Sequence, residues 1–236
     1  MANYRAFQIA FDEQSLSNID SSFAIPILNN RVSPFFENET ISKLVDFNVT
    51  QNFDGYYAVL SHKFFQETTD CELKAITKEK IEANLGTHDV VSFFGFKKDN
   101  FEMFRHAEKV HKGIDICYQE LFRLLGHTYN PSMRMRFVVY RNAFFAKSHI
   151  YERYVKEMLD PCIELMSDKK NELLYSSLWK DSRYPYQESR FRKHPELRDR
   201  FVRDMGVPYY PFHTFVLERM FSYWLNLNHE ITCKHV

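Results

Sequence analysis

Three polar residues near position 60 have the chemistry to bind a phosphate or a sugar. Ser61, His62 and Lys63 follow Tyr56 to Leu60, a short aromatic and aliphatic run with the length and composition of a β-strand. In an open α/β sheet, ligands bind at the carboxyl ends of the strands, because helices cover both faces. A hydroxyl, an imidazole and an ammonium group at such an end predict a ligand site. A strand that runs into an ordinary surface turn is the alternative interpretation.

Two further groups of polar residues lie at expected breaks in the chain. A predicted helix breaks at Gly113 beside His111, which indicates either a loop that contacts a sugar or phosphate or an ordinary helix stop. Arg141 and Asn142 follow an expected strand at 137–140. An asparagine at a strand end can form paired hydrogen bonds with a sugar hydroxyl or a base edge. It can also simply make a turn.

The last predicted helix carries a carboxylate next to a guanidinium group. Glu218 and Arg219 interrupt an apolar run, and polar residues recur every four positions along one stripe: Thr214, Glu218, Ser222 and Asn226. A solvated stripe is one interpretation. The other places Glu218 and Arg219 at a cleft, where a carboxylate can serve as a general base.

The composition argues against several classes of protein. Lys plus Arg and Asp plus Glu both number 31, and a formal net charge of zero argues against a broad nucleic-acid surface. There are only 6 glycines and no glycine-rich phosphate loop, and the 4 cysteines are scattered without metal-ligand spacing. No secretion signal or run of about 20 apolar residues is present, so we expect a soluble, cytoplasmic protein.

Strand and helix patterns alternate up to about residue 166. Strands are expected at 4–11, 23–28, 56–60, 89–96 and 137–140, and helices at 35–47, 78–85, 101–110, 114–125 and 148–166. We expect Thr77, Asn100 and Ser148 to cap helices, Gly86 to stop the helix at 78–85, and Pro161 to kink the helix at 148–166. Pro26 should place the strand at 23–28 at a sheet edge or a bulge. This order predicts an α/β fold with a mostly parallel sheet covered on both faces. Residues 1–236 then form a single domain, in which 1–166 are the core and 167–236 close one end.

Six short stretches spread over the chain carry a family resemblance. They are YRAFQIAFDEQS, DGYYAVLSHKFFQET, DVVSFFGF, VHKG, VVYRNAFFAKSHIYERYV and PFHTFVLERMFS. Their order and spacing resemble small bacterial and viral glycosyltransferase-like proteins of the GT-A, or nucleotide-diphospho-sugar transferase, type, which serve capsule, lipopolysaccharide or other surface-glycan synthesis. The resemblance implies a three-layer α/β/α sandwich. It also implies hexosyl or deoxyhexosyl transfer from a nucleotide-diphospho-sugar donor to a hydroxyl of a glycan or lipid-linked saccharide acceptor.

The resemblance also implies roles for individual residues. Asp12 would lie near the nucleotide, and the catalytic base would be Glu218, Asp54 or His62. The remaining substrate-binding residues would be Ser61, Lys63, His111, Arg141, Asn142 and Arg219. The family's Asp-x-Asp, which holds Mn²⁺ or Mg²⁺, is missing here, so Asp89 is the candidate metal ligand and Lys63, Arg141 or Arg219 could neutralise the diphosphate instead.

Two other functions remain open from the sequence. The first is a catalytically degenerate glycan- or protein-binding module. The second is a metal-dependent hydrolase built on histidines, although His106 and His111 are separated by about 500° of helical turn and share no face. The aromatic residues Tyr209, Tyr210 and 221–225 could touch a membrane peripherally, but core packing explains them equally.

Overall fold

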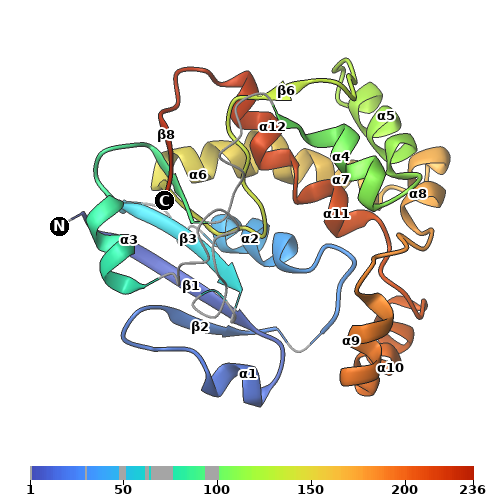
Figure 1. Cartoon of the computed structure of the whole chain (residues 1–236), viewed down its shortest axis with the longest axis horizontal. Coiled ribbons are helices and arrows are strands. Elements are labelled where there is room, and N and C mark those ends of the chain that lie inside the picture. Colours follow the sequence, from blue (N-terminus) through green and yellow to red (C-terminus); the bar gives the residue numbers. More distant parts are fainter. Residues whose placement is uncertain (1, 30, 48–51, 62–63, 65–76, 94–100) are drawn as a thin grey trace.

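The computed structural model describes residues 2–29, 31–47, 52–61, 64, 77–93 and 101–236. Within them the main feature is a six-stranded sheet in the order β2-β1-β3-β7-β4-β8 (Figure 1). Its strands are β1 (Tyr4–Ala10), β2 (Ile25–Leu28), β3 (Tyr56–Ser61), β4 (Val90–Ser92), β7 (Phe144–Lys147) and β8 (Cys233–His235). A separate two-stranded ribbon pairs β5 (Phe101–Glu102) with β6 (Arg134–Met135). The predicted cap Asn100 and the site residues His62 and Lys63 lie outside the described residues.

The sheet is mostly parallel, as the alternating pattern predicts. β1 pairs in parallel with β2 and β3, and β4 with β8. β7 runs antiparallel to both of its neighbours, β3 and β4. β2 is an edge strand, as its Pro26 predicts, since proline cannot donate a ladder hydrogen bond.

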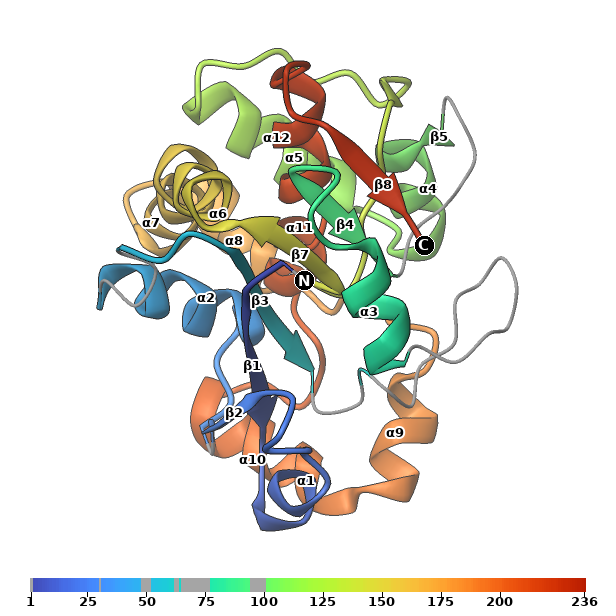
Figure 2. The ribbon, with the colours of Figure 1, turned by 90° about the vertical axis from the view of Figure 1, so that its left-hand side faces the viewer.

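Two aromatic layers cover the faces of this sheet. Phe144 stacks on Phe221, with ring centroids 3.9 Å apart, and packs near Tyr151 on the side where α6 lies. Its neighbour Phe145 points to the opposite face, where it contacts Phe23 and Phe93. Successive strand residues alternate between faces, so one short strand anchors both layers. Figure 2 shows α2 and α6 on one side of the sheet and α3 on the other.

The helices of the first two thirds are α1 (Glu13–Ser17), α2 (Glu37–Asp46), α3 (Lys78–Asn84), α4 (Met103–Val110), α5 (Ile114–Leu124), α6 (Ser148–Tyr154) and α7 (Asp160–Ser167). Thr77 caps α3 through its side chain, as predicted. Ser148 does not cap α6; its hydroxyl donates to the carbonyl of Phe53 instead. Between α6 and α7 the chain forms a π-helix, η2 (Val155–Leu159). This wide turn accommodates Pro161, which cannot donate an intrahelical hydrogen bond.

The last third is helical, and it contains more helix than the sequence pattern indicates. It comprises α8 (Glu172–Leu178), α9 (Gln187–Lys193), α10 (Pro195–Met205), α11 (His213–Leu217) and α12 (Met220–Leu227). The aromatic residues Tyr210, Phe221 and Trp224 are buried, which confirms the core-packing interpretation for them. No helix among the described residues combines the length and apolar character that a membrane crossing requires.

The predicted strand at 137–140 is wrong. These residues are buried but belong to no strand, and the chain turns at 141–142 before β7 begins at Phe144. The backbone of this segment bonds side chains of the last helices rather than a neighbouring strand. Ser222 Oγ accepts from the Val139 N–H at 2.9 Å and donates to the Val139 carbonyl at 3.2 Å. The apolar composition of residues 137–140 indicates correctly that they are buried. The partners of their backbone hydrogen bonds decide which secondary structure they form.

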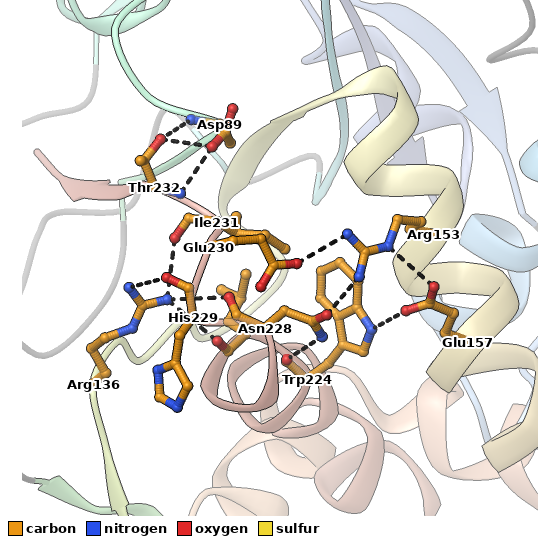
Figure 3. A network of polar contacts seen from close by, with 11 residues as sticks. Asp89, Arg136, Arg153, Glu157, Trp224, Asn228, His229, Glu230, Ile231 and Thr232 are labelled. Atoms are coloured by element: carbon orange, nitrogen blue, oxygen red, sulfur yellow. Dashed lines mark hydrogen bonds and ion pairs between the residues drawn. The ribbon is translucent and has the colours of Figure 1, made fainter.

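A polar network holds the chain between α12 and β8 (Figure 3). The Arg136 guanidinium donates to the carbonyls of Leu225 at 3.4 Å and Ile231 at 3.1 Å. Arg153 donates to Asn228 and Glu230 and lies 5.4 Å from the Trp224 ring centre. These contacts fix the approach to the last strand.

Asp89 completes this network at the start of β4. Its carboxylate accepts from the Thr232 N–H at 2.9 Å and the Thr232 hydroxyl at 2.7 Å, and it pairs with Lys147 at 2.9 Å. Burial alone would raise the pKa of Asp89, but the bonds from Thr232 and Lys147 outweigh it and lower the pKa to about 2. Asp89 therefore joins β4, β7 and the entry to β8.

We expect Asp89→Asn to lower the free energy of unfolding at pH 7 by about 1–3 kcal/mol, because it removes the ion pair and weakens the accepted hydrogen bonds. A carboxyl with a lowered folded-state pKa stabilises the protein above its ordinary value, here 3.8, and this contribution is lost as the pH falls toward 2. Urea denaturation measures the change. Asp54→Asn, at an exposed aspartate on the same edge of the sheet, is the matched control and should change stability by less than about 0.5 kcal/mol. Equal effects of the two substitutions would contradict the proposed role of Asp89.

Candidate functional site

Several predicted site residues meet at one edge of the sheet. β1 and β3 end there, since Ile9 pairs with Ser61, and Asp12 follows directly after β1. β7 runs antiparallel to β3, with Tyr57 paired to Ala146, so it starts on the side of the sheet where β3 ends. Arg141 and Asn142 therefore enter the sheet from that side. In both views β1 and β3 point toward the end of the molecule that holds α9 and α10 (Figures 1 and 2).

Asp12 is fixed by the short helix that follows it. Its Oδ1 accepts from the Ser15 N–H at 2.6 Å, and Ser15 Oγ accepts from the Asp12 N–H at 3.0 Å, which is a reciprocal capping box. Next to it, Arg200 from α10 donates to the Phe11 carbonyl at 3.2 Å. Contacts with α1 and with α10 thus hold the end of β1 in place.

Arg141 and Asn142 form a left-handed turn, with φ of 58° and 52°. Asparagine tolerates this conformation better than most residues, whereas arginine is strained in it by about 1 kcal/mol. The Arg141 N–H donates to Glu218 Oε1 at 3.2 Å. This contact orients the Glu218 carboxylate toward the turn.

The polar stripe of the last helices is not a solvated surface, contrary to the simpler interpretation. Asn226 Oδ1 accepts from the Arg136 N–H at 3.2 Å, Ser222 holds Val139, and Glu218 holds Arg141. Three side chains at four-residue spacing therefore bind three backbone groups of the segment 136–141. The four-residue spacing of these polar side chains is visible in the sequence. The sequence does not reveal that the stripe binds the backbone of segment 136–141.

Arg219 is buried behind Glu218, with 3% of its surface exposed. Its Nη1 donates to the Phe215 carbonyl and lies 3.3 Å from Glu218 Oε2. Its Nε has no hydrogen-bond partner among the described residues. The guanidinium carbon lies 5.6 Å from the Tyr140 ring centre. Because the Arg219 guanidinium is buried, its charge acts mainly on neighbouring groups. Among the described residues, Glu218 is the carboxylate with which it pairs.

His111 is buried and neutral. Its ring stacks on Phe215 with centroids 3.9 Å apart, and 2% of its surface is exposed. Burial, together with the positive charge of Arg219, lowers its pKa to about 3. The same two causes lower the pKa of His106. His111 thus carries no charge near pH 7 with which to bind a phosphate.

The helix break beside His111 has a structural cause. The Glu108 carboxylate accepts from the N–H groups of Gly113 at 2.9 Å and Asp115 at 3.1 Å, so it occupies the N-terminus of α5. Gly113 adopts a φ of 99°, which favours glycine. These contacts support the ordinary helix-stop interpretation of this segment.

Asp54 and Asp89 lie at the opposite edge of the sheet. Asp54 precedes β3, and the six residues of that strand span about 20 Å before Ser61. Asp89 precedes β4 and is engaged by Thr232 and Lys147. The structure therefore does not bring either residue, predicted as base and metal ligand respectively, together with Glu218. No group of three or more metal-ligating side chains occurs in the described part of the chain, and Mn²⁺ or Mg²⁺ stays a prediction.

We expect the protein to lose stability steadily as the pH falls from about 6.5 toward 3. Burial lowers the pKa of His213 to about 3, as it does that of His111, so both take up protons only on unfolding in this range. Each contributes a slope of up to about 1.4 kcal/mol per pH unit. Chemical denaturation at pH 7, 6 and 5 measures the slope.

The variant His213→Phe removes one titrating group from a pocket formed by Phe35 and Trp179, and should make the slope shallower. His194→Gln, at an exposed position, should leave it unchanged. An unchanged slope in the His213→Phe variant would count against the argument.

The ends of β1 and β3 carry Asp12 and Ser61, and the turn that precedes β7 carries Asn142 beside the contact between Arg141 and Glu218. Such groups can bind the hydroxyls of a sugar or ribose, and a carboxylate can accept a proton. Comparison with protein-family models, with curated protein sequences and with solved structures found no match for this chain.

Proposed function

We propose that the chain is a glycosyltransferase that moves a sugar from a nucleotide-diphospho-sugar to an acceptor hydroxyl of a surface glycan. The observation that carries this proposal is the strand order at the start of the sheet. The chain runs β1, β2, β3, but β1 lies between the other two, so consecutive connections leave in opposite directions. The carboxyl ends of β1 and β3 form a topological switch point, where open α/β sheets bind nucleotides and related ligands.

The residues near this switch point suit the donor and the acceptor of the transfer. Asp12 and Ser61, at the ends of β1 and β3, suit the ribose or sugar hydroxyls of the donor. Asn142 and Glu218 enter from the β7 side and the last helices. The donor therefore lies over β1 and β3, and the acceptor approaches from the side of α11.

In the proposed reaction an acceptor hydroxyl attacks the anomeric carbon of the donor. The bond from that carbon to the diphosphate breaks, and the electron pair leaves with the nucleoside diphosphate. Glu218 takes the proton of the attacking hydroxyl. Arg219 is a positioning residue, since its buried guanidinium lies 3.3 Å from Glu218 Oε2. A bound Mn²⁺ or Mg²⁺, or exposed cations such as Arg141, would balance the charge of the diphosphate.

The first test is thermal stabilisation by UDP, GDP and CMP, each with and without Mn²⁺. At a concentration 100 times its Kd, the matching nucleotide adds about 2.7 kcal/mol to the free energy of unfolding, which raises the melting temperature by several degrees. A protein that responds to no nucleotide under either condition would rule out the proposed donor site.

The second test separates chemistry from binding. Glu218→Gln keeps a hydrogen-bond acceptor for the Arg141 N–H but cannot act as a base, so we expect transfer or donor hydrolysis to fall about 10²–10⁴-fold with nucleotide binding retained. Glu230→Gln, at an exposed glutamate on the approach to β8, is the matched control and should keep full activity. Equal activity of the Glu218→Gln and wild-type proteins would remove Glu218 from the mechanism.

A glycan-binding module without catalysis is the second candidate. It is favoured by the engagement of both carboxylates at this edge, since Asp12 caps α1 and Glu218 binds the Arg141 backbone. Under this function, glycan binding persists while no sugar nucleotide is turned over. Hydrolysis assays with a panel of sugar nucleotides distinguish the two.

A further inference from the structure

One exposed and one half-buried tyrosine lie side by side on the connection between α8 and α9. Tyr186 is 64% exposed, and Tyr184 beside it is half-buried. Their ring centroids are 5.6 Å apart, and the ring planes meet at 72°. The exposed ring of Tyr186 thus stands at an angle on the packed ring of Tyr184, an arrangement that offers an apolar face next to a hydroxyl group.

The pair is held rigidly from below. The Tyr184 ring packs on Tyr210 and Phe215, each with centroids 5.3 Å away. The carbonyls of Tyr184 and Tyr186 accept from the N–H groups of Gln187 and Arg190, each at 2.9 Å. Pro185 separates the two tyrosines and restricts the backbone between them. A preorganised surface loses little conformational entropy when a ligand binds.

The same connection contains one left-handed residue. Arg183 adopts a φ of 51°, and its N–H donates to Asp181 Oδ1 at 2.8 Å. Asp181 in turn forms a bridge with Pro211, just before α11. Arginine rarely adopts this left-handed conformation, so the surrounding contacts hold the connection in one shape.

The pair is coupled to the element that carries Glu218. Phe215, under Tyr184, lies about one helical turn before Glu218, and its carbonyl accepts from Arg219. Arg190 lies 5.7 Å from the Tyr184 ring centre and donates to the Tyr210 hydroxyl at 3.4 Å. A guanidinium group thus borders the aromatic surface.

We propose that Tyr184 and Tyr186 form a stacking platform for a sugar ring of the acceptor glycan, with Arg190 donating hydrogen bonds at its border. This inference rests on the proposed transfer to a glycan and adds the acceptor subsite. Two rings at a steep angle cannot enclose a flat nucleobase between parallel faces. A saturated sugar ring can lay its apolar C–H face on one tyrosine and direct its hydroxyls to the second tyrosine and to Arg190.

The test measures binding of chitotetraose, maltotetraose, a mannose tetrasaccharide and a hyaluronan tetrasaccharide to the full chain by calorimetry. We expect the wild-type protein to bind at least one of them. Tyr186→Ala should weaken that binding at least roughly tenfold, while Tyr186→Trp should retain it, because the stacking face remains. Phe47→Ala removes an aromatic side chain that is 77% exposed at the end of α2, and should leave binding unchanged.

The melting temperature of each variant and its stabilisation by nucleotide are measured in parallel. Tyr186→Ala should leave the nucleotide effect unchanged, which separates the acceptor subsite from the donor site. Wild-type binding to none of the four oligosaccharides, or equal binding by the Tyr186→Ala protein, would overturn the platform and leave the donor site standing. Loss of glycan binding in that variant, with no nucleotide effect in any protein, would support the platform and overturn the transferase.

Discussion

The hydrogen bonds from one stripe of side chains on the last helices organise the candidate site. Asn226, Ser222 and Glu218 hold the backbone of Arg136, Val139 and Arg141 in turn. The Val139 N–H is buried, and without Ser222 it would lack this partner, at a cost of about 1–3 kcal/mol. The stripe thereby fixes where β7 begins. It also holds the Arg141–Asn142 turn just before β7, which runs antiparallel to β3.

The same helices bring a buried charge close to the site. Arg219 lies among aromatic rings and two neutral histidines, with Glu218 as its nearest carboxylate. A cation removed from water interacts strongly with the groups around it, because few solvent dipoles screen it. Arg219 binds one oxygen of the Glu218 carboxylate, and the Arg141 N–H binds the other. The carboxylate is therefore fixed in position before any ligand binds.

Local patterns in the sequence predicted most of the sheet and many of the helices. The short runs around Tyr57 and Val91 were correctly predicted as strands, because neighbouring turn residues and β-branched or aromatic side chains favour that conformation. The capping threonine and Gly86 marked α3 correctly. Ser61 and Asp12 were predicted near one another, and the register of β1 and β3 brings them to neighbouring strand ends, whereas the place of Asn142 in a site stays a prediction.

The errors arise where long-range contacts decide the local structure. Residues 137–140 resemble a strand, but their hydrogen bonds go to a helix more than 75 residues later in the chain. Asp54 resembles a site residue because it adjoins the strand that ends at Ser61, yet it lies at the other end of that strand. The helices α8 and α9 were missed because each has only seven residues and two or three buried positions, too few for a clear periodic pattern. The composition and periodicity of these segments do not show which distant part of the chain packs against them.

The last strand has a kinetic consequence for the molecule. β8 joins the sheet beside β4, and the bond between Thr232 and Asp89 spans 143 positions of the chain. Closing so long a loop costs chain entropy before any contact rewards it, so topologies of this kind fold slowly. Until β8 arrives, that side of β4 has an open row of backbone donors and acceptors. A growing or partly folded chain therefore exposes a strand edge that can pair with strands of other molecules. Chaperones that bind partly folded chains would reduce such pairing in a cell.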